Sequence, residues 1–425
     1  MSLIRDAEIE NTIRAYSTPL WQVAGLTPDS ISIHLVNDDS LNAFVAGGQK
    51  LFLHTGLIIR SENASQLIGV IAHESGHIAG GHLSRTGDAI DTAMTSSTII
   101  GLLLGGAAAL SGRGDLGAAV LQGSQQAGLR SFLSFSRGQE SAADTAAMRY
   151  LEGTGQSAKG FAEFFDILGE QELLSVSQQQ PYAQTHPLSR DRVEAVRAFI
   201  AKSANSNKPS KPEFESMHAR MKAKLIGFMK PLQTTLRAYP ETDLSLPARY
   251  ARSIAYYRVA NLAKATALVD ELIAEAPNDP YFHELKGQML FENGRGAEAL
   301  PAYERAVALA PDAPLLLVGL AHAQIERGDP SLRMKAIDNL QFALTREPNE
   351  PSSWRHLATA YGQNGQMGES SHALAEEALL QRKYTDAIGL GRRAQGILPK
   401  GSPKWLRASD IVALAEEGLK KQKNR

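Results

Sequence analysis

Apolar and polar residues follow one another along this chain in patterns that predict a mainly helical protein with a small β component. Residues 67–72, LIGVIA, form an apolar run. Asn63 and Gln66 stand before it and match an N-cap residue and the side chain three positions later. This pattern predicts a helix with a buried stem. Residues 50–58, KLFLHTGLI, alternate only loosely and indicate an ordinary strand.

The C-terminal part of the chain repeats itself. Prolines recur there at an interval of thirty-four residues, the period of the tetratricopeptide repeat (TPR), and then at thirty-seven. They form two registers, which are Pro277, Pro311 and Pro348, and Pro280, Pro314 and Pro351. We place the extra residues of the longer interval in residues 328–334, GDPSLRM, between the two helices of that repeat.

Small residues recur at matching places in these units, where they let paired helices approach closely, and proline then ends the second helix. The pairs are Gly287 and Gly319, Ala299 and Ala336, and Ala306 and Ala343. Residues 374–403 supply a further unit and residues 405–422 a closing helix. We therefore expect an α-solenoid of TPR repeats, and an unrelated helical bundle is the alternative.

A polar, proline-containing and weakly periodic segment, residues 201–216, precedes the repeats, and a helical stretch follows it at about residues 217–238. The chain is thus expected to have three parts. They are an N-terminal domain over residues 1–203, a linker with a connecting helix over residues 204–245, and a TPR domain over residues 246–425.

The composition is typical of a folded chain and argues against one class of partner. Of 425 residues, 43% are hydrophobic and 21% charged, and the formal net charge is −1. Because no strong basic field exists, nucleic acid is not an expected partner. The chain has no cysteine, so neither disulfides nor thiolate metal sites are available.

Three histidines lie within ten positions of one another, and two of them belong to the motif H-E-x-x-H. His73 and His77 are four residues apart, so on a helix both imidazoles project from one face and can bind one ion. Glu74 between them is close enough to touch a water on that ion. In this arrangement two neutral nitrogens hold Zn²⁺, and the carboxylate deprotonates the water that attacks a peptide carbonyl. Chance occurrence is the alternative.

The position of His82 decides which kind of metal site this is. The metzincin pattern requires a third histidine six residues after His77, and that position holds a leucine. The third ligand must then come from elsewhere, and Glu140, with Asp144 one helical turn later, is the leading candidate. Such a pair is more often a solvated helix face. Two histidine ligands reverse that preference, because zinc needs a third ligand and the imidazoles need carboxylates to orient them.

Four ordered motifs resemble the gluzincin peptidases of the CAAX-prenyl-protease and HtpX type. They are HESGH at 73–77, the preceding residues 42–58, ESAAD at 140–144 and THPLSRDR at 185–192. The resemblance implies a helical, zincin-like domain in which His73, His77 and Glu140 bind zinc, Glu74 is the general base and Asp144 orients a ligand histidine. It also implies that residues 42–58 form a β-hairpin whose edge pairs with an extended substrate, through Asn42, Ala43, Phe44 and Val45.

A peptidase domain followed by TPR repeats resembles periplasmic proteases of Gram-negative bacteria. The resemblance implies an endopeptidase for unfolded or misassembled outer-membrane proteins, with repeats that dock substrates or the barrel-assembly machinery. It places His186 near the zinc as a regulatory fourth ligand and Arg192 near the site, although on sequence alone His186 is as readily a loop residue. It also implies a periplasmic location and a signal peptide already removed, since MSLIRDAEIE has no signal-peptide pattern.

Two further alternatives stay open on the sequence. A TPR chaperone or adaptor with a latent or structural metal site competes with the endopeptidase, and the intact Glu74 favours the enzyme. Residues 99–110, IIGLLLGGAAAL, are too short to span a membrane, since twelve residues make about 18 Å of helix. We expect a buried or interfacial helix there, and peripheral membrane contact is the alternative.

Overall fold

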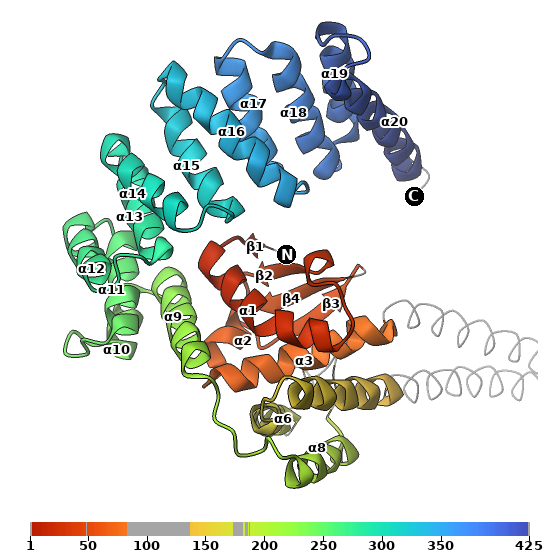
Figure 1. Cartoon of the computed structure of the whole chain (residues 1–425), viewed down its shortest axis with the longest axis vertical. Helices are drawn as coiled ribbons and strands as arrows, with labels where there is room; N and C mark the ends of the chain where they lie inside the picture. Colours follow the sequence, from red (N-terminus) through yellow and green to blue (C-terminus); the bar gives the residue numbers. More distant parts are fainter. Residues whose placement is uncertain are drawn as a thin grey trace, which may run out of the picture. The chain divides into compact units, whose positions relative to one another are not determined.

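The chain divides into two compact units, Met1–Leu225 and Ile226–Arg425. Helices dominate both units, and the N-terminal unit also contains a small sheet (Figure 1). The predicted fold class is confirmed. Residues 99–110, for which we expect a buried or interfacial helix with peripheral membrane contact as the alternative, lie outside the part of the chain that the structure describes. The structure is a computed structural model that describes residues 2–47, 49–82, 137–172, 182, 186 and 188–423.

The sheet of the N-terminal unit has four strands in the order β1-β2-β4-β3. β4 pairs parallel with β2 and antiparallel with β3, so β3 lies at an edge of the described sheet (Figure 1). Leu51 and Leu53 of β4 are buried, whereas Phe52 between them is only partly buried. The strands are β1 (Leu3–Ile4), β2 (Ser32–Val36), β3 (Ala43–Ala46) and β4 (Lys50–His54).

The predicted hairpin over residues 42–58 is too long at its C-terminal end. β4 ends at His54, and α2 (Thr55–Arg60) begins at once. The change of direction follows from contacts with a distant loop: the Thr55 hydroxyl donates to the Asp38 carbonyl oxygen at 2.9 Å, and the Gly56 N–H donates to the same oxygen at 2.9 Å. A Cβ on Gly56 would lie 2.1 Å from the Asp39 carbonyl oxygen, so glycine is required for this close approach.

The histidine motif lies on α3 (Ala64–Gly80), as predicted. Asn63 is its N-cap and accepts a hydrogen bond from the Gln66 N–H at 3.0 Å, while the Gln66 side chain accepts from the N–H of Glu62. The stem from Leu67 to Ala72 is buried. α3 is therefore a central helix of this unit, and its motif is held in the interior.

Three further elements pack around α3, and two more helices follow them along the chain. α1 (Ala7–Val23) is tied to α3 by the Trp21 indole N–H, which donates to the Ser75 hydroxyl at 3.0 Å. α6 (Lys159–Glu172) packs against α3 where Gly69 meets Phe161. A helix over residues 137–153 approaches α3 most closely at Gly76, where a Cβ would lie 2.8 Å from the Ala143 carbonyl oxygen. α8 (Arg190–Lys202) and α9 (Pro212–Met229) follow.

The second unit is a succession of helices in which consecutive helices pack against each other (Figure 1). Prolines stand at the first position of α13, α15, α16 and α17, where their missing N–H is not needed. The helices are α10 (Leu232–Ala238), α11 (Leu246–Arg258), α12 (Leu262–Glu275), α13 (Pro280–Glu292), α14 (Gly296–Leu309), α15 (Pro314–Glu326), α16 (Pro330–Arg346), α17 (Pro351–Gln363), α18 (Met367–Leu380), α19 (Tyr384–Ile397) and α20 (Pro403–Lys423).

The interval of thirty-seven residues has a different origin from the predicted one. The connections 293–295 and 327–329 have the same length, and α16 has 17 residues where α14 has 14. The extra residues therefore join the helix, because Asp329 caps it through the Ser331 N–H and Pro330 begins it. Gly287 and Gly319 do admit a close neighbour: both lie against the Tyr303 ring.

The predicted linker, residues 204–245, contains the whole of α9 and α10, and the division between the units falls inside α9. The domain boundaries at residues 203 and 245 stay predictions. No helix within the described residues is both long enough and apolar enough to cross a membrane.

Candidate metal centre

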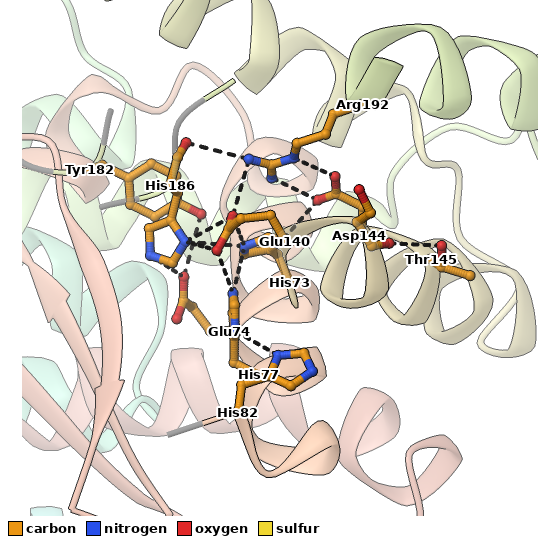
Figure 2. A network of polar contacts seen from close by, with 11 residues as sticks. His73, Glu74, His77, His82, Glu140, Asp144, Thr145, Tyr182, His186 and Arg192 are labelled. Carbon is orange, nitrogen blue, oxygen red and sulfur yellow. Dashed lines mark hydrogen bonds and ion pairs between the residues drawn. The ribbon is translucent and has the colours of Figure 1, made fainter. Parts of the chain in front are cut away.

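Four buried side chains bring potential metal ligands to one point. They are His73 and His77 from α3, Glu140 from the helix of residues 137–153, and His186, which stands before α8. One donor atom from each lies within 4.8 Å of the others. Figure 2 shows the four side chains converging from separate segments of the chain. Helical spacing alone places His73 beside His77, whereas Glu140 and His186 are brought there by packing.

The donor atoms of the cluster are unusually close for groups that do not share a cation. The two Nε2 atoms of His73 and His77 are 3.1 Å apart. The Glu140 carboxylate lies 3.4 Å from His73 Nε2 and 3.3 Å from His77 Nε2, and His186 Nδ1 lies 3.1 Å from Glu140 Oε1. Imidazole nitrogens with one carboxylate are a donor set that suits Zn²⁺. The residues present therefore fit a zinc ion.

Two charged side chains outside the cluster, Asp144 and Arg192, contact its ligands and orient them. Asp144 Oδ1 lies 2.9 Å from Nδ1 of His73, which points the Nε2 of that ring into the cluster. Arg192 donates to both oxygens of Asp144, at 2.6 and 2.8 Å, and its Nη1 lies 3.1 Å from Glu140. Arg192 thus positions two carboxylates and is itself separated from the centre by them (Figure 2).

Glu74 is fully buried next to the cluster. The Tyr182 hydroxyl donates to Glu74 Oε1 at 3.4 Å, and His186 Nε2 lies 3.6 Å from the same oxygen. Glu74 Oε2 is buried and has no hydrogen-bond partner within the described residues. A buried carboxylate oxygen in this position is costly unless a further group binds there. Glu74 Oε2 can therefore accept a hydrogen bond from a water or a substrate.

Electrostatics favours ionised carboxylates in the cluster. Burial opposes ionisation of Glu140, but hydrogen bonds with His186, His73 and His77 outweigh it and hold the pKa of Glu140 well below its usual range. Burial likewise opposes ionisation of Asp144, and Arg192 and His73 outweigh it, so this pKa is also lowered. Burial lowers the pKa of His77, which favours the neutral ring that a metal ligand needs.

Two other groups of the site, His73 and Tyr182, have raised pKa values, which favour their protonated forms. Burial lowers the pKa of His73, but the hydrogen bonds with Asp144 and Glu140 outweigh burial and raise it to about 9 in the absence of a cation. Burial raises the pKa of Tyr182 well above its ordinary value, with the nearby charge of Glu74 acting in the same direction. Tyr182 therefore remains a neutral hydrogen-bond donor.

The structure brings together seven of the residues singled out from the sequence. They are His73, Glu74, His77, Glu140, Asp144, His186 and Arg192. Asn42 to Val45 are not part of the cluster and lie at the edge strand β3.

Sequence reasoning missed the contacts of Tyr182 and His82. Tyr182 stands four residues before His186, and the His186 N–H donates to the Tyr182 carbonyl oxygen at 2.8 Å; this spacing is the available signal. His82 is too near His77 in sequence for the metzincin pattern, yet its Nδ1 lies 2.9 Å from Nδ1 of His77.

Residues 4–200 match the model of peptidase family M48, which includes every residue of the cluster. The chain carries a peptidase family M48 domain. Residues 250–314 match a tetratricopeptide repeat model. The chain is accordingly a metalloprotease with TPR repeats, and zinc is the metal that both the family and the donor set indicate.

Curated relatives match either most of this chain or a smaller part of it. The β-barrel assembly-enhancing protease of Yersinia pestis is 27% identical over 94% of this chain and 82% of the relative. The protein of that name in Escherichia coli K12 is 24% identical over 94% of this chain and 81% of the relative. Metalloprotease YcaL of E. coli K12 is 28% identical over 41% of this chain and 63% of the relative.

Proposed function

We propose that this chain is a zinc-dependent endopeptidase for unfolded or misassembled outer-membrane proteins in the bacterial envelope. The observation that carries the proposal is Glu74, a buried carboxylate beside a four-donor cluster, one of whose oxygens has no partner within the described residues. A purely structural zinc site has no use for such a group. The target class is supported by the relatives, which are named for β-barrel assembly, since β-barrels are the spanning proteins of outer membranes.

Each side chain of the site then has a separate role. His73, His77 and Glu140 hold the zinc, with Asp144 orienting His73. When bound, the zinc polarises a peptide carbonyl and lowers the pKa of water in the site. Glu74 accepts the proton of the attacking water and delivers it to the leaving amine.

The edge strand β3 offers a binding surface for an extended substrate. His54 donates its N–H to the Asn42 carbonyl oxygen at 3.0 Å, so Asn42 bonds to β4. In an antiparallel pair the bonded residues alternate, and the backbone groups of Ala43 and Val45 therefore point to the open edge. We assign residues 42–45 to pairing with substrate backbone, which binds peptides with little dependence on their side chains.

The Tyr182 segment joins this edge to the cluster. The Tyr182 N–H donates to the Leu41 carbonyl oxygen at 3.3 Å, next to Asn42, while the Tyr182 hydroxyl reaches Glu74. His186, four residues later, occupies a donor position of the cluster. We assign His186 the role of a gate, because a fourth protein ligand takes the position that substrate and water need.

The repeats dock substrates or partners of the barrel-assembly machinery, and the protein acts in the periplasm. Support comes from the relatives' names and from the repeats themselves. A second function, a TPR chaperone or adaptor with a latent metal site, is favoured by one observation: His186 already stands within 3.2 Å of both Glu140 oxygens. Cleavage decides between the two.

The test is proteolysis of an unfolded outer-membrane barrel protein by the wild type and by Glu74→Gln, with zinc content measured on both. We expect Glu74→Gln to keep its zinc and lose cleavage by about 100-fold or more, because glutamine preserves size and removes the base. Glu213→Gln, an exposed position on α9, is the matched control and should cleave like the wild type. Equal cleavage by Glu74→Gln and the wild type would contradict the assignment of Glu74, and absence of cleavage by the wild type would favour the chaperone.

A further inference from the structure

The two histidines of the motif are held by different partners. Both turn Nε2 toward the cluster, so the Nδ1 atoms face away from it. His73 Nδ1 has a carboxylate behind it, Asp144, at 2.9 Å. His77 Nδ1 has an imidazole behind it instead, since Nδ1 of His82 lies at the same distance (Figure 2). A ligand ring needs such a partner, because rotation about its side-chain bonds would otherwise turn Nε2 out of position.

The end of α3 is built so that His82 can reach back to His77. Gly81 caps the helix with φ +60°, a left-handed conformation that glycine adopts without strain, and its N–H donates to the carbonyl oxygens of His77 and Ile78. This cap ends the helix one residue before His82. Gly80 then leaves space for the returning ring, because a Cβ there would lie 2.4 Å from Nε2 of His82. The two glycines thus serve the placement of one side chain.

A third contact links His82 to the other ligand helix. The Gln139 side-chain amide donates to the His82 carbonyl oxygen at 3.1 Å, and Gln139 precedes Glu140. The His82 side chain is itself buried, with 6% of its surface exposed. His82 is therefore fixed from both sides, by the end of α3 and by the helix that supplies the carboxylate ligand.

We propose that His82 is the positioning residue of His77. This rests on the proposed ligand set, in which His77 presents a lone pair at Nε2. Its proton is then on Nδ1 and is donated to the Nδ1 lone pair of His82, whose own proton is on Nε2. The neutral His82 orients the His77 ring by accepting its hydrogen bond, whereas the anionic Asp144 orients the His73 ring. The groups that orient His73 and His77 thus carry one negative charge, that of Asp144, instead of two.

The test measures zinc affinity of the full-length chain by competition with a chelator, in a Glu74→Gln background that excludes self-cleavage. We expect His82→Leu to weaken zinc binding by about 10- to 100-fold, as changes behind metal ligands do. His82→Asn should recover most of the affinity, because its amide oxygen can take the place of Nδ1. The Co²⁺-loaded proteins should differ in their absorption spectra. The spectrum of His82→Leu should differ from that of the parent, and the spectrum of His82→Asn should resemble that of the parent more closely.

Gly80→Ala tests the same contact without touching His82. Alanine at a helical position should stabilise α3 by up to about 1 kcal/mol, yet its Cβ displaces the His82 ring. We therefore expect zinc affinity to fall while the thermal stability of the zinc-free protein does not. The matched control is His218→Leu, another buried histidine of this unit, whose Nε2 contacts the Ser61 carbonyl oxygen at 3.1 Å and not the cluster. It should bind zinc like its parent.

The outcomes separate two failures. If the Glu74→Gln parent does not bind zinc, the proposed function itself fails. If the parent binds zinc and both His82→Leu and Gly80→Ala bind it equally tightly, only the role of His82 is overturned. The role is also overturned if His82→Asn binds as weakly as His82→Leu, or if His218→Leu loses as much affinity as His82→Leu.

Discussion

At the scale of single residues, charge in the cluster is concentrated in Glu140. Its carboxylate contacts three histidines and Arg192 in a buried site, and these contacts keep it ionised. It is the only residue of the four-donor group that brings a negative charge to the metal. Changes at Glu140 and at His186 should therefore have different consequences, since Glu140 supplies charge and His186 is the proposed gate.

We predict that Glu140→Gln loses zinc. The amide has no charge for the cation, and it leaves Arg192 Nη1 without its carboxylate partner. Zinc affinity should fall by more than about 100-fold, since even changes behind a ligand cost about 10- to 100-fold. Zinc content after dialysis and chelator competition measure the effect. Glu213→Gln should retain the metal, and full, tightly held zinc in Glu140→Gln would assign the third ligand to another residue.

For His186→Ala we predict faster proteolysis or self-cleavage with zinc still bound through the other three residues. Removing a fourth protein ligand exposes the position that water and the scissile carbonyl need. The rate should be measured on a small unfolded substrate that does not need the repeats. If His186 instead stabilises the developing oxyanion, the same change should slow cleavage by about 100- to 1,000-fold. A rate at or below that of the wild type thus excludes the gate.

At the scale of elements, the cluster depends on close contacts between α3 and its neighbours, and the proposed substrate site adds the edge strand β3. Gly76 allows the helix of residues 137–153 to approach α3, which brings Glu140 within reach of the two histidines. β3 contributes no side chain to the four-donor group. In the proposed substrate site β3 contributes backbone groups, and a substitution that removes one backbone N–H can test this role.

We predict that Val45→Pro impairs substrate binding. Proline removes an N–H that faces the open edge and leaves the hydrogen bonds to β4 in place, a position where edge strands tolerate it. KM for an unfolded substrate should rise by about fivefold to tenfold, since one hydrogen bond contributes about 1 kcal/mol. Val45→Ala keeps the N–H and controls for the lost side chain. Equal KM values in the two variants would show that substrate does not pair with this edge, and zinc content should be unchanged in both.

At the scale of the whole molecule, all four donors of the cluster lie in the unit Met1–Leu225. The repeats of Ile226–Arg425 are stabilised by their own packing, for example by the Tyr303 ring between Gly287 and Gly319. Metal binding should therefore stabilise one unit and leave the other unchanged, since a ligand stabilises only the state that binds it.

Calorimetry with and without a zinc chelator tests this division. We predict that zinc at about 100 times its Kd stabilises the N-terminal unit by about 2.7 kcal/mol and leaves the second transition in place. Tyr303→Ala should identify that second transition by lowering it, because truncating a buried aromatic ring costs about 3–5 kcal/mol. In Glu140→Gln the zinc-dependent shift should disappear. A zinc-dependent shift of the transition that Tyr303→Ala lowers would contradict the assignment.

Two features could be predicted from the sequence because they depend on neighbours along the chain. The spacing of His73 and His77 places both rings on one helix face wherever that helix lies, and the cap at Asn63 marks where the helix begins. The period of the repeats is local in the same sense, since each helix packs mainly against the next. Even there the longer interval was misplaced, because Asp329 and Pro330 lengthen α16 and leave the connection unchanged.

Only the tertiary structure decided which distant groups meet. Glu140 and His186 lie 67 and 113 residues beyond His73 in the sequence, and packing brings them to it. The backbone of Asp38 ends β4 at His54, where the pattern of the strand itself gives no sign of an end. The cap at Gly81 turns His82 back onto His77. Periodicity encodes local conformation, whereas these contacts depend on which surfaces bury one another when the whole unit folds.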